Sequence, residues 1–274
     1  MSGRRGWLAA GKQRGVVFGV GLTTLGALVL WALTCWSMEP VSAKVGAMGF
    51  GAARIQLSDR DGSALNSIYT NQWNLFEQAT LHSVPERLVV ALLLAEDQRF
   101  YRHRGQDWLA RLRALAQNIG AGEVVSGAST ISEQVVRMLN PRPRTLWSRW
   151  LEGWEAGRLE QSLGKEAILE FYLNQVPYAA RRRGVVQAAR YYFDRDLATL
   201  SVAEMLALAV LIRAPSRLDP VVGDRQALHL AMTRLARRMV VAGKLASEDV
   251  RQLDVGSLKL RRPRLAVNLS LIHI

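Results

Sequence analysis

The sequence predicts a mainly α-helical domain that follows one apolar N-terminal segment and a small β-hairpin. Two observations carry this prediction. No charged residue occurs from residue 15 to residue 38, so this segment differs sharply from the rest of the chain. From about residue 74 onward, apolar residues recur at helical spacing and most breaks fall at Gly or Pro. A length of 274 residues allows one or two domains with a sizeable core.

The composition excludes several classes of protein. Hydrophobic residues make up 49% and charged residues 22% of the chain, which is too apolar for a disordered protein. The single cysteine, Cys35, excludes an internal disulfide, and no Cys/His cluster has the spacing of a zinc site. The net charge of +13 favours an anionic partner, which could be nucleic acid, an acidic membrane surface or a phosphorylated substrate.

Residues 15–38 have the length and composition of a membrane anchor. At about 1.5 Å per residue, the segment reaches roughly the 30 Å thickness of a bilayer core. Lys and Arg residues precede it in 1–14, so the positive-inside rule puts 1–14 in the cytoplasm and everything after residue 38 outside. The alternative is a signal peptide cleaved near Ala43, which fits so long an apolar run less well. Either way the folded part leaves the cytoplasm, which disfavours nucleic acid as the partner.

The rest of the sequence divides into a linker and a series of helices. We expect a linker with a β-hairpin over 39–75, the strands being Arg54–Leu57 and Ala64–Tyr69. Pro85 begins a helix with an almost entirely apolar run, Leu88–Ala95. Further helices are expected at Trp108–Ile119, Ser129–Leu139, Trp147–Leu163, Lys165–Asn174, Ser201–Ile212 and over 224–253.

Two adjacent carboxylates, Glu96 and Asp97, end the first of these helices. Burying a carboxylate is costly unless it is paired, so a glutamate at the end of an apolar helix is a candidate general base. The alternative is that both carboxylates are solvated and that Asp107 pairs with a neighbouring arginine.

Two further segments are each open to two interpretations. Ser126–Gln134 combines small residues, hydroxyls and a new helix start, which fits an anion-binding nest or a plain N-cap equally well. Glu152 follows Arg149 by three residues, and this spacing alone predicts an ordinary surface ion pair.

In order and spacing, these segments resemble the motifs of glycosyltransferase family 51, the peptidoglycan glycosyltransferases. AEDQRFYRHRGQDW (Ala95–Trp108) resembles the first motif, EDxxFxxHxGxD, and SGASTISEQVVRM (Ser126–Met138) resembles the second, GxSTxxxQ. SRWLE (Ser148–Glu152), KEAILEFYLNQVPY (Lys165–Tyr178) and the region Ala188–Pro220 are similar to the third, fourth and fifth. The sequences PRPRT and APSRLDP resemble class A penicillin-binding proteins of the 1C type, with a monofunctional transglycosylase as the other interpretation.

The resemblance implies a lysozyme-like helical domain over 76–220, on the outer face of the bacterial cytoplasmic membrane. A helical extension over 221–264 and a tail over 265–274 would follow, and whether a transpeptidase domain is missing after the tail stays open. The implied activity is that of an inverting enzyme that polymerises lipid II into the β-1,4-linked glycan strands of peptidoglycan. The implied partners are lipid II, the growing glycan strand, the membrane and other cell-wall synthesis proteins.

The resemblance also assigns site residues. Glu96 matches the base that deprotonates the 4-hydroxyl of the acceptor sugar. Glu152 matches the second essential carboxylate, which orients the diphosphate or binds a divalent cation, Mg²⁺ or Mn²⁺; no other cofactor is implied. The positions that match substrate-binding or supporting residues are Asp97, His103, Ser129, Thr130, Gln134, Arg137, Arg149, Arg213 and Ser216. Of these, Asp97 and His103 are expected to hold the loop of Glu96 rather than to react.

Several positions depart from the family pattern, namely Ala128, Glu133, Ser148, Ala179 and Asp194. Glu133 is expected to place a negative charge near an anionic substrate. These departures keep a second hypothesis open, a catalytically inactive scaffold that binds lipid II. A third is a lysozyme-like enzyme that cleaves glycan strands, although the motifs for a diphosphate site argue against it.

Overall fold

The computed structural model describes residues 21, 23–41, 45, 73–122, 128–251, 253, 258 and 260. Within these ranges the chain is mainly helical and has no β-strand beyond two isolated bridges, Arg104–Gln106 and Pro177–Arg183. The predicted β-hairpin, most of the linker 39–75 and the tail 265–274 lie outside the described residues. The mainly helical class predicted from the sequence is confirmed.

The predicted anchor, 15–38, is described from residue 21 onward except for residue 22, and residues 23–37 are helical. In the part of the chain that the structure describes, no helix combines the length and the apolar character that a membrane crossing requires. A membrane span over 15–38 therefore stays a prediction.

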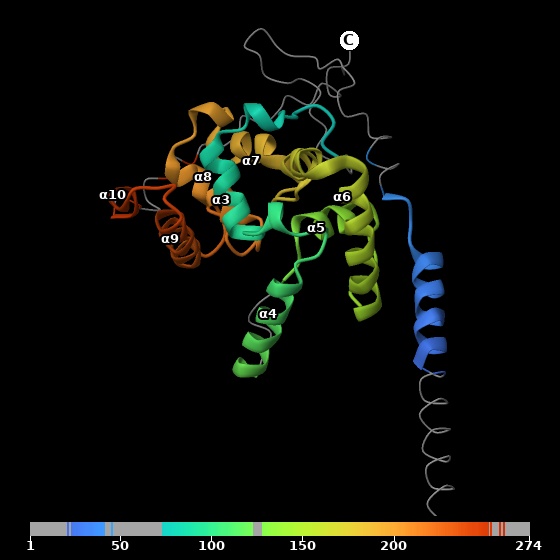
Figure 1. Cartoon of the computed structure of the whole chain (residues 1–274). Helices are drawn as coiled ribbons and strands as arrows, with labels where there is room; N and C mark the ends of the chain where they lie inside the picture. The colour runs from blue at the N-terminus through green and yellow to red at the C-terminus, as the bar shows by residue number, and fades with distance from the viewer. Residues whose placement is uncertain are drawn as a thin grey trace, which may run out of the picture.

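The folded body is built from α-helices and short 3₁₀ segments, shown in Figure 1. In chain order they are η1 (Leu81–Ser83), α3 (Glu86–Glu96), η2 (Phe100–Arg102), α4 (Trp108–Ala121), α5 (Ile131–Leu139), α6 (Leu146–Gln175), α7 (Gly184–Phe193), η3 (Leu197–Thr199), α8 (Val202–Leu211), α9 (Arg225–Val241) and α10 (Ser247–Arg251). Ser201 and Glu204 form a capping box at the start of α8, where the sequence predicts a helix. Gly164 interrupts α6 with non-helical angles, φ 75° and ψ 168°, where the sequence predicts a break between two helices.

The helix pattern differs from the sequence prediction in two places. The sequence analysis assigns no helix to α7, although its buried residues include Val185, Ala188, Ala189 and Tyr192 at the spacing of one helix face. The predicted stretch 224–253 is two helices, α9 and α10. Gly243 lies between them with a φ of +67°, a left-handed conformation that is typical of a helix end.

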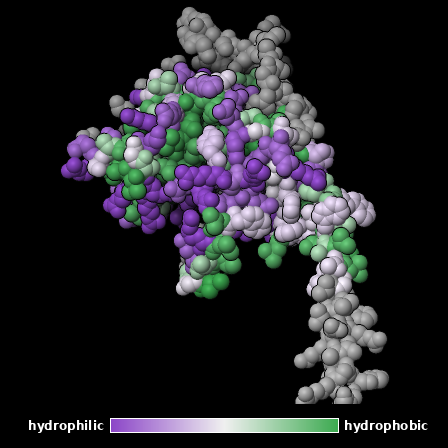
Figure 2. Space-filling model, in the orientation of Figure 1, coloured by the Kyte–Doolittle hydropathy of each residue, from purple (hydrophilic) through white to green (hydrophobic). Residues whose placement is uncertain are grey.

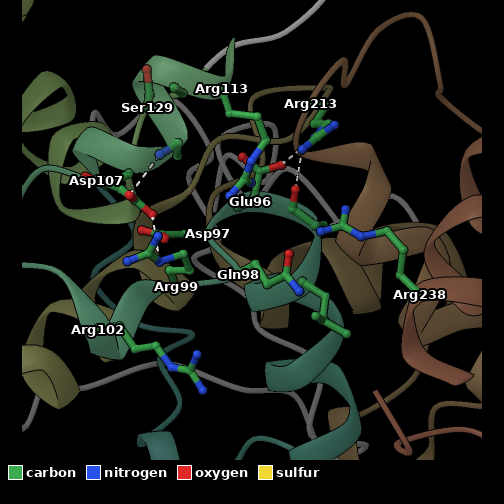
Figure 3. A pocket seen from close by; sticks show the side chains of 15 residues that line it. Glu96, Asp97, Gln98, Arg99, Arg102, Asp107, Arg113, Ser129, Arg213 and Arg238 are labelled. Carbon is green, nitrogen blue, oxygen red and sulfur yellow. Dashed lines mark hydrogen bonds and ion pairs between the residues drawn. The ribbon is translucent and has the colours of Figure 1, made fainter. Parts of the chain in front are cut away.

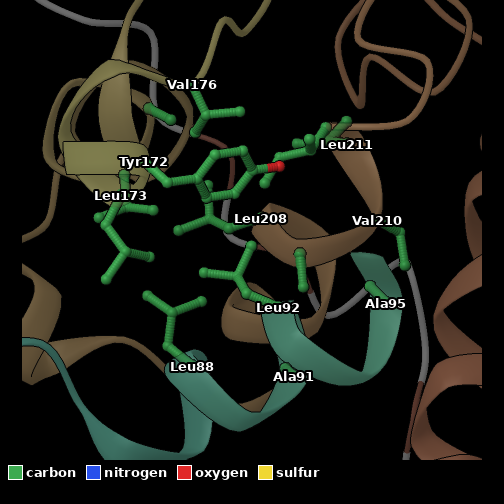
Figure 4. Packing of buried hydrophobic residues seen from close by; sticks show 14 of the residues in the cluster. Leu88, Ala91, Leu92, Ala95, Tyr172, Leu173, Val176, Leu208, Val210 and Leu211 are labelled. Atoms are coloured by element: carbon green, nitrogen blue, oxygen red, sulfur yellow. The ribbon is translucent and has the colours of Figure 1, made fainter. Parts of the chain in front are cut away.

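The core lies where α3, α6 and α8 meet, as Figure 4 shows. Leu88 and Leu92 of α3, Tyr172 of α6, and Leu208 and Leu211 of α8 are all fully buried. Burying each leucine side chain contributes roughly 1.5–3 kcal/mol. α3 also packs against α9. The end of α3, where Glu96 lies, is therefore held by a helix that is anchored in the core.

The N-terminal helix, residues 23–37, contacts the body through α6. The indole N–H of Trp150 donates to the hydroxyl of Thr34 at 3.0 Å. The backbone N–H of Glu39 donates to the buried carboxylate of Glu155 at 2.8 Å, and Arg142 pairs with the same carboxylate at 2.7 Å. Glu155 thus joins the segment after the N-terminal helix to the body.

The loop between α3 and α4 lies directly on α6 because Gly105 allows a close approach. Gly105 has a φ of +78°, and a Cβ there would come within 2.3 Å of the backbone nitrogen of Gly157 on α6. The hydroxyl of Thr130, just before α5, donates to the carbonyl oxygen of Gly105 at 2.6 Å. The loop, α5 and α6 therefore meet at a point that has no room for a side chain on residue 105.

Replacing Gly105 with Ala is expected to lower the free energy of unfolding by at least about 2 kcal/mol, because the new Cβ meets backbone atoms and the left-handed φ is unfavourable. Gly120→Ala is the control, since a Cβ at Gly120 on α4 meets nothing within 4 Å. The free energy of unfolding of Gly120→Ala is expected to rise by up to about 1 kcal/mol, because Ala favours a helix more than Gly does. Both values are measured by denaturant unfolding, and a Gly105→Ala variant as stable as wild type would contradict the account.

Candidate functional site

A pocket of about 520 Å³ opens at the C-terminal end of α3, as Figure 3 shows. Its walls come from the end of α3, η2, α4, the residues before α5, the segment after α8, and α9. The charged residues that line it are Glu96, Asp97, Arg99, Arg102, Asp107, Arg113, Arg213 and Arg238. Arginines outnumber carboxylates, so the pocket favours an anionic ligand.

Glu96 is the last residue of α3, and its side chain is only 9% exposed. Gln134 of α5 donates from Nε2 to one carboxylate oxygen at 3.0 Å, and Arg213 donates from Nε to the other at 3.2 Å. Arg213 also donates to the backbone oxygen of Ala95. Glu96 is therefore held between α5 and the segment after α8, and it is not a solvated residue at a helix end.

Asp97 and His103 form a buried pair behind Glu96, with each side chain 4% exposed. The Nε2 atom of His103 lies 3.0 Å from Oδ2 of Asp97, and the same oxygen accepts the backbone N–H of Ile131 at 3.0 Å. Because Ile131 is the first residue of α5, the pair joins the loop after α3 to the N-terminus of that helix. Asp107 has a separate role: it caps α4 by accepting the N–H of Ala110, and it lies 3.5 Å from Arg99.

The start of α5 is a capped helix rather than an open anion-binding nest. The hydroxyl of Thr130 accepts the N–H of Glu133, and the carboxylate of Glu133 accepts the N–H of Thr130, which completes a capping box. The N–H of Ile131 already donates to Asp97. Of the two interpretations of Ser126–Gln134, the N-cap fits, because these backbone donors have partners within the protein. Residues 126 and 127 lie outside the described ranges, and Ser129 lines the pocket.

Glu133 has partners that its place in the sequence does not reveal. One carboxylate oxygen binds Arg111 of α4 and the other serves the capping box. Burial raises the pKa of the Glu133 carboxyl above its ordinary value, while the positive charge of Arg111 opposes this rise. Glu133 is not among the pocket residues. Its charge is largely compensated within the protein, so the expected conflict with an anionic substrate is weakened.

Glu152 pairs with Arg137 of α5. Both of its carboxylate oxygens accept from Arg137, at distances of 2.7–3.2 Å, and the side chain of Glu152 is 6% exposed. The hydrogen bonds to Glu152 raise the pKa of Arg137. Arg137 also reaches the hydroxyl of Ser129 at 3.4 Å. The surface ion pair between Glu152 and Arg149 is wrong, because Glu152 faces the interior while Arg149 is exposed.

The surroundings of Glu152 do not fit a divalent cation. Arg137 occupies both carboxylate oxygens, and its positive charge would oppose a cation in the same place. In the described ranges, no group of three or more His, Cys, Asp or Glu residues could hold a metal ion. Mg²⁺ or Mn²⁺ near Glu152 stays a prediction that the residues in place do not support.

The structure brings some of the expected site residues together and leaves others apart. Glu96, Asp97, Ser129, Thr130 and Arg213 line the pocket, while Gln134 and Arg137 connect α5 to Glu96 and Glu152. Arg149 and Ser216 are exposed and do not line it.

Sequence reasoning missed Arg99, Arg102, Arg113 and Arg238, which line the pocket from the loop after α3, η2, α4 and α9. None of them occupies a defining position of a motif. The strongly positive net charge was the one signal in the sequence that pointed toward them.

The family model described as Transglycosylase matches residues 61–244, which is more than half of the chain. The chain belongs to the transglycosylase family. The family resemblance found in the sequence motifs is thereby confirmed, and the matched region extends beyond the predicted domain 76–220 on both sides.

The relatives of this transglycosylase chain are larger proteins. It is 34% identical over 233 residues to penicillin-binding protein 1C of Escherichia coli (strain K12), a match that covers 84% of this chain and 28% of the relative. It is 36% identical over 214 residues to penicillin-binding protein 1A of Neisseria cinerea, covering 77% of this chain and 25% of the relative. The crystal structure of penicillin-binding protein 1A from Haemophilus influenzae aligns with a TM-score of 0.42 and 18% identity, covering 77% of this chain and 22% of that one. The chain thus spans about a quarter of the length of these relatives.

Replacing Glu133 with Gln is expected to raise the melting temperature of this transglycosylase at pH 7 by a few degrees. Gln preserves the capping box and removes a carboxylate whose ionisation burial disfavours. Since the pKa of Glu133 is raised on folding, the wild type regains stability as the pH falls through that raised value toward the ordinary value of about 4.3. The advantage of the variant should therefore shrink on acidification.

Calorimetry over a pH series measures this difference, and Glu248→Gln at an exposed position is the control without a pH-dependent gain. A Glu133→Gln variant less stable than wild type at pH 7 would show that the ion pair with Arg111 outweighs the burial cost.

Proposed function

We propose that this chain is a membrane-attached peptidoglycan glycosyltransferase that polymerises lipid II into β-1,4-linked glycan with inversion at the anomeric carbon. The observation that carries the proposal is a partly buried carboxylate, Glu96, facing an arginine-rich pocket in a chain of the transglycosylase family. Transfer of a sugar from a lipid diphosphate needs a base for the attacking hydroxyl and positive charge for the leaving group. The pocket offers both.

In the proposed reaction, Glu96 takes the proton of the acceptor 4-hydroxyl as that oxygen attacks the anomeric carbon of the donor. The new carbon–oxygen bond forms while the bond to the diphosphate breaks, and the electron pair leaves with the diphosphate. Gln134 and Arg213 each donate one hydrogen bond to Glu96. A carboxylate oxygen has two lone-pair directions, so Glu96 keeps the capacity to accept the proton.

The arginines supply the charge that a departing diphosphate requires. Arg213 and Arg238 both line the pocket, and they come from different segments. Burial lowers the pKa of Arg238, and the positive charge of Arg213 lowers it further. Two guanidinium groups close enough to repel each other are stabilised by an anion between them, which is the role we assign to the diphosphate.

An exposed apolar surface on α4 supports attachment to the membrane. Trp108, Leu112, Leu115 and Ile119 lie three or four residues apart and are 56–73% exposed. α4 projects from the body toward the side to which the N-terminal helix also extends, and Figure 2 shows apolar side chains on both. Contiguous exposed apolar residues mark a membrane or protein contact. A membrane contact would keep the pocket within reach of a lipid-linked substrate.

Replacing Glu96 with Gln is expected to reduce polymerisation of labelled lipid II by at least about 100-fold, because the base is lost. The fold should persist, since Gln has the same size and still accepts from Arg213. Glu86→Gln is the matched control, since Glu86 is exposed at the other end of the same helix. Retention of most activity in Glu96→Gln would remove Glu96 from the mechanism.

The same assay separates the alternatives. A scaffold that binds lipid II without turnover predicts identical behaviour of wild type and Glu96→Gln. A glycan-cleaving enzyme predicts the release of soluble fragments from purified cell-wall sacculi.

Replacing Arg213 with Ala is expected to raise the KM for lipid II by about tenfold or more, because charge-assisted hydrogen bonds are worth about 1.5–3 kcal/mol. The melting temperature should change little, since the Arg213 side chain is largely exposed. Arg217→Ala removes an equal charge from an exposed position outside the pocket and serves as the control. An unchanged KM in Arg213→Ala would contradict its assignment to substrate binding.

A further inference from the structure

Both ends of the Gln134 amide are held by the protein. Its Nε2 atom donates to Glu96 at 3.0 Å, and its Oε1 atom accepts from the hydroxyl of Tyr172 at 3.2 Å. Gln134 lies on α5 and Tyr172 on α6. Two hydrogen bonds in series therefore cross the interface between these helices and end on the carboxylate of Glu96.

The Tyr172 hydroxyl donates to the oxygen end of the Gln134 amide. Tyr172 is fully buried, and Figure 4 shows its ring among side chains of α3, α6 and α8. Burial raises the pKa of Tyr172 well above its ordinary value, and the negative charge of Glu96 raises it further, so the hydroxyl stays protonated. An amide has an acceptor at one end and donors at the other. Because a carboxylate only accepts, the N–H end of the amide faces Glu96, and the Tyr172 hydroxyl holds the oxygen end in place.

We propose that Tyr172 is a positioning residue for the general base, because it anchors the oxygen end of the Gln134 amide whose N–H group donates to Glu96. This inference rests on the proposed function, in which Glu96 is the base. Without this anchor the Gln134 side chain is free to move away from Glu96, which then loses one of its two hydrogen-bond donors and its fixed position.

Other charged and titratable groups also face Glu96. Arg213 donates to it, Asp97 follows it in the chain, and the buried hydroxyl of Tyr178 lies within electrostatic reach. Arg113 and Arg238 line the same pocket. Of the described residues, Gln134 and Arg213 are the ones that hydrogen-bond to the Glu96 carboxylate, so the orientation of the Gln134 amide controls half of its direct contacts.

Tyr178 offers a matched control for Tyr172. Both tyrosines are buried, and burial raises the pKa of each well above the ordinary value. The hydroxyl of Tyr178 donates to the backbone oxygen of Leu208 at 3.1 Å and not to Gln134. Replacing either tyrosine with Phe thus removes one buried hydroxyl and one hydrogen bond, but only the change at Tyr172 releases the amide.

Steady-state kinetics of lipid II polymerisation over a pH series test the inference. Tyr172→Phe is expected to lower kcat by about tenfold at unchanged KM, and to move the acidic limb of the pH–rate profile to higher pH. Tyr178→Phe is expected to keep the kcat and the profile of wild type. The melting temperatures of both variants are also measured. A loss of kcat that comes only from lower stability would appear in both variants.

A double variant separates positioning from packing. In a Gln134→Ala background, Tyr172→Phe is expected to have no further effect on kcat, because the group it orients is absent. Additive losses in the double variant would overturn the inference, as would wild-type kcat and pH profile in Tyr172→Phe. A wild-type protein that does not polymerise lipid II beside a working positive control defeats the proposed function and this inference with it. If the wild type polymerises lipid II and Tyr172→Phe has the same kcat and pH profile, the inference is wrong while the proposed function stands.

Discussion

Two buried carboxylates beside one short helix form the constraint on which the site depends. Glu96 and Glu152 are both almost completely removed from solvent, and an unpaired carboxylate in such a place costs several kcal/mol. α5 supplies a partner to each, Gln134 to Glu96 and Arg137 to Glu152. These partners are three residues apart and share one face of the helix. The position of α5 therefore decides the environment of both carboxylates at once.

The loop that follows Glu96 in turn positions α5. Asp97 accepts the first N–H of the helix, and the carbonyl of Gly105 accepts from Thr130. Gly105 can approach the backbone of α6 at Gly157 only because residue 105 has no side chain. The loop after Glu96 thus positions α5, and α5 in turn holds Glu96 through Gln134. This closed arrangement explains why residues such as His103 and Gly105 matter to a pocket that they do not line.

Two of the departures from the family pattern have local physical compensation. Glu133 pairs with Arg111 and completes the cap of α5. Asp194 ends α7 in a left-handed conformation with a φ of +52°, and Asp is among the few residues that tolerate these angles. Compensation of this kind keeps these two helix ends intact, which agrees with an enzymatic function more than with a degenerate scaffold.

The sequence by itself determined most helix ranges, the family and a carboxylate at the end of an apolar helix. These features depend on residues a few positions apart, so local spacing reveals them. Only the tertiary structure decided that Glu152 pairs with Arg137 rather than Arg149, that Glu133 meets Arg111, and that Arg238 shares a pocket with Arg213. Spacing along one helix shows which side chains share a face. A partner on another helix depends on how the helices pack, and that is settled by the burial of the core as a whole.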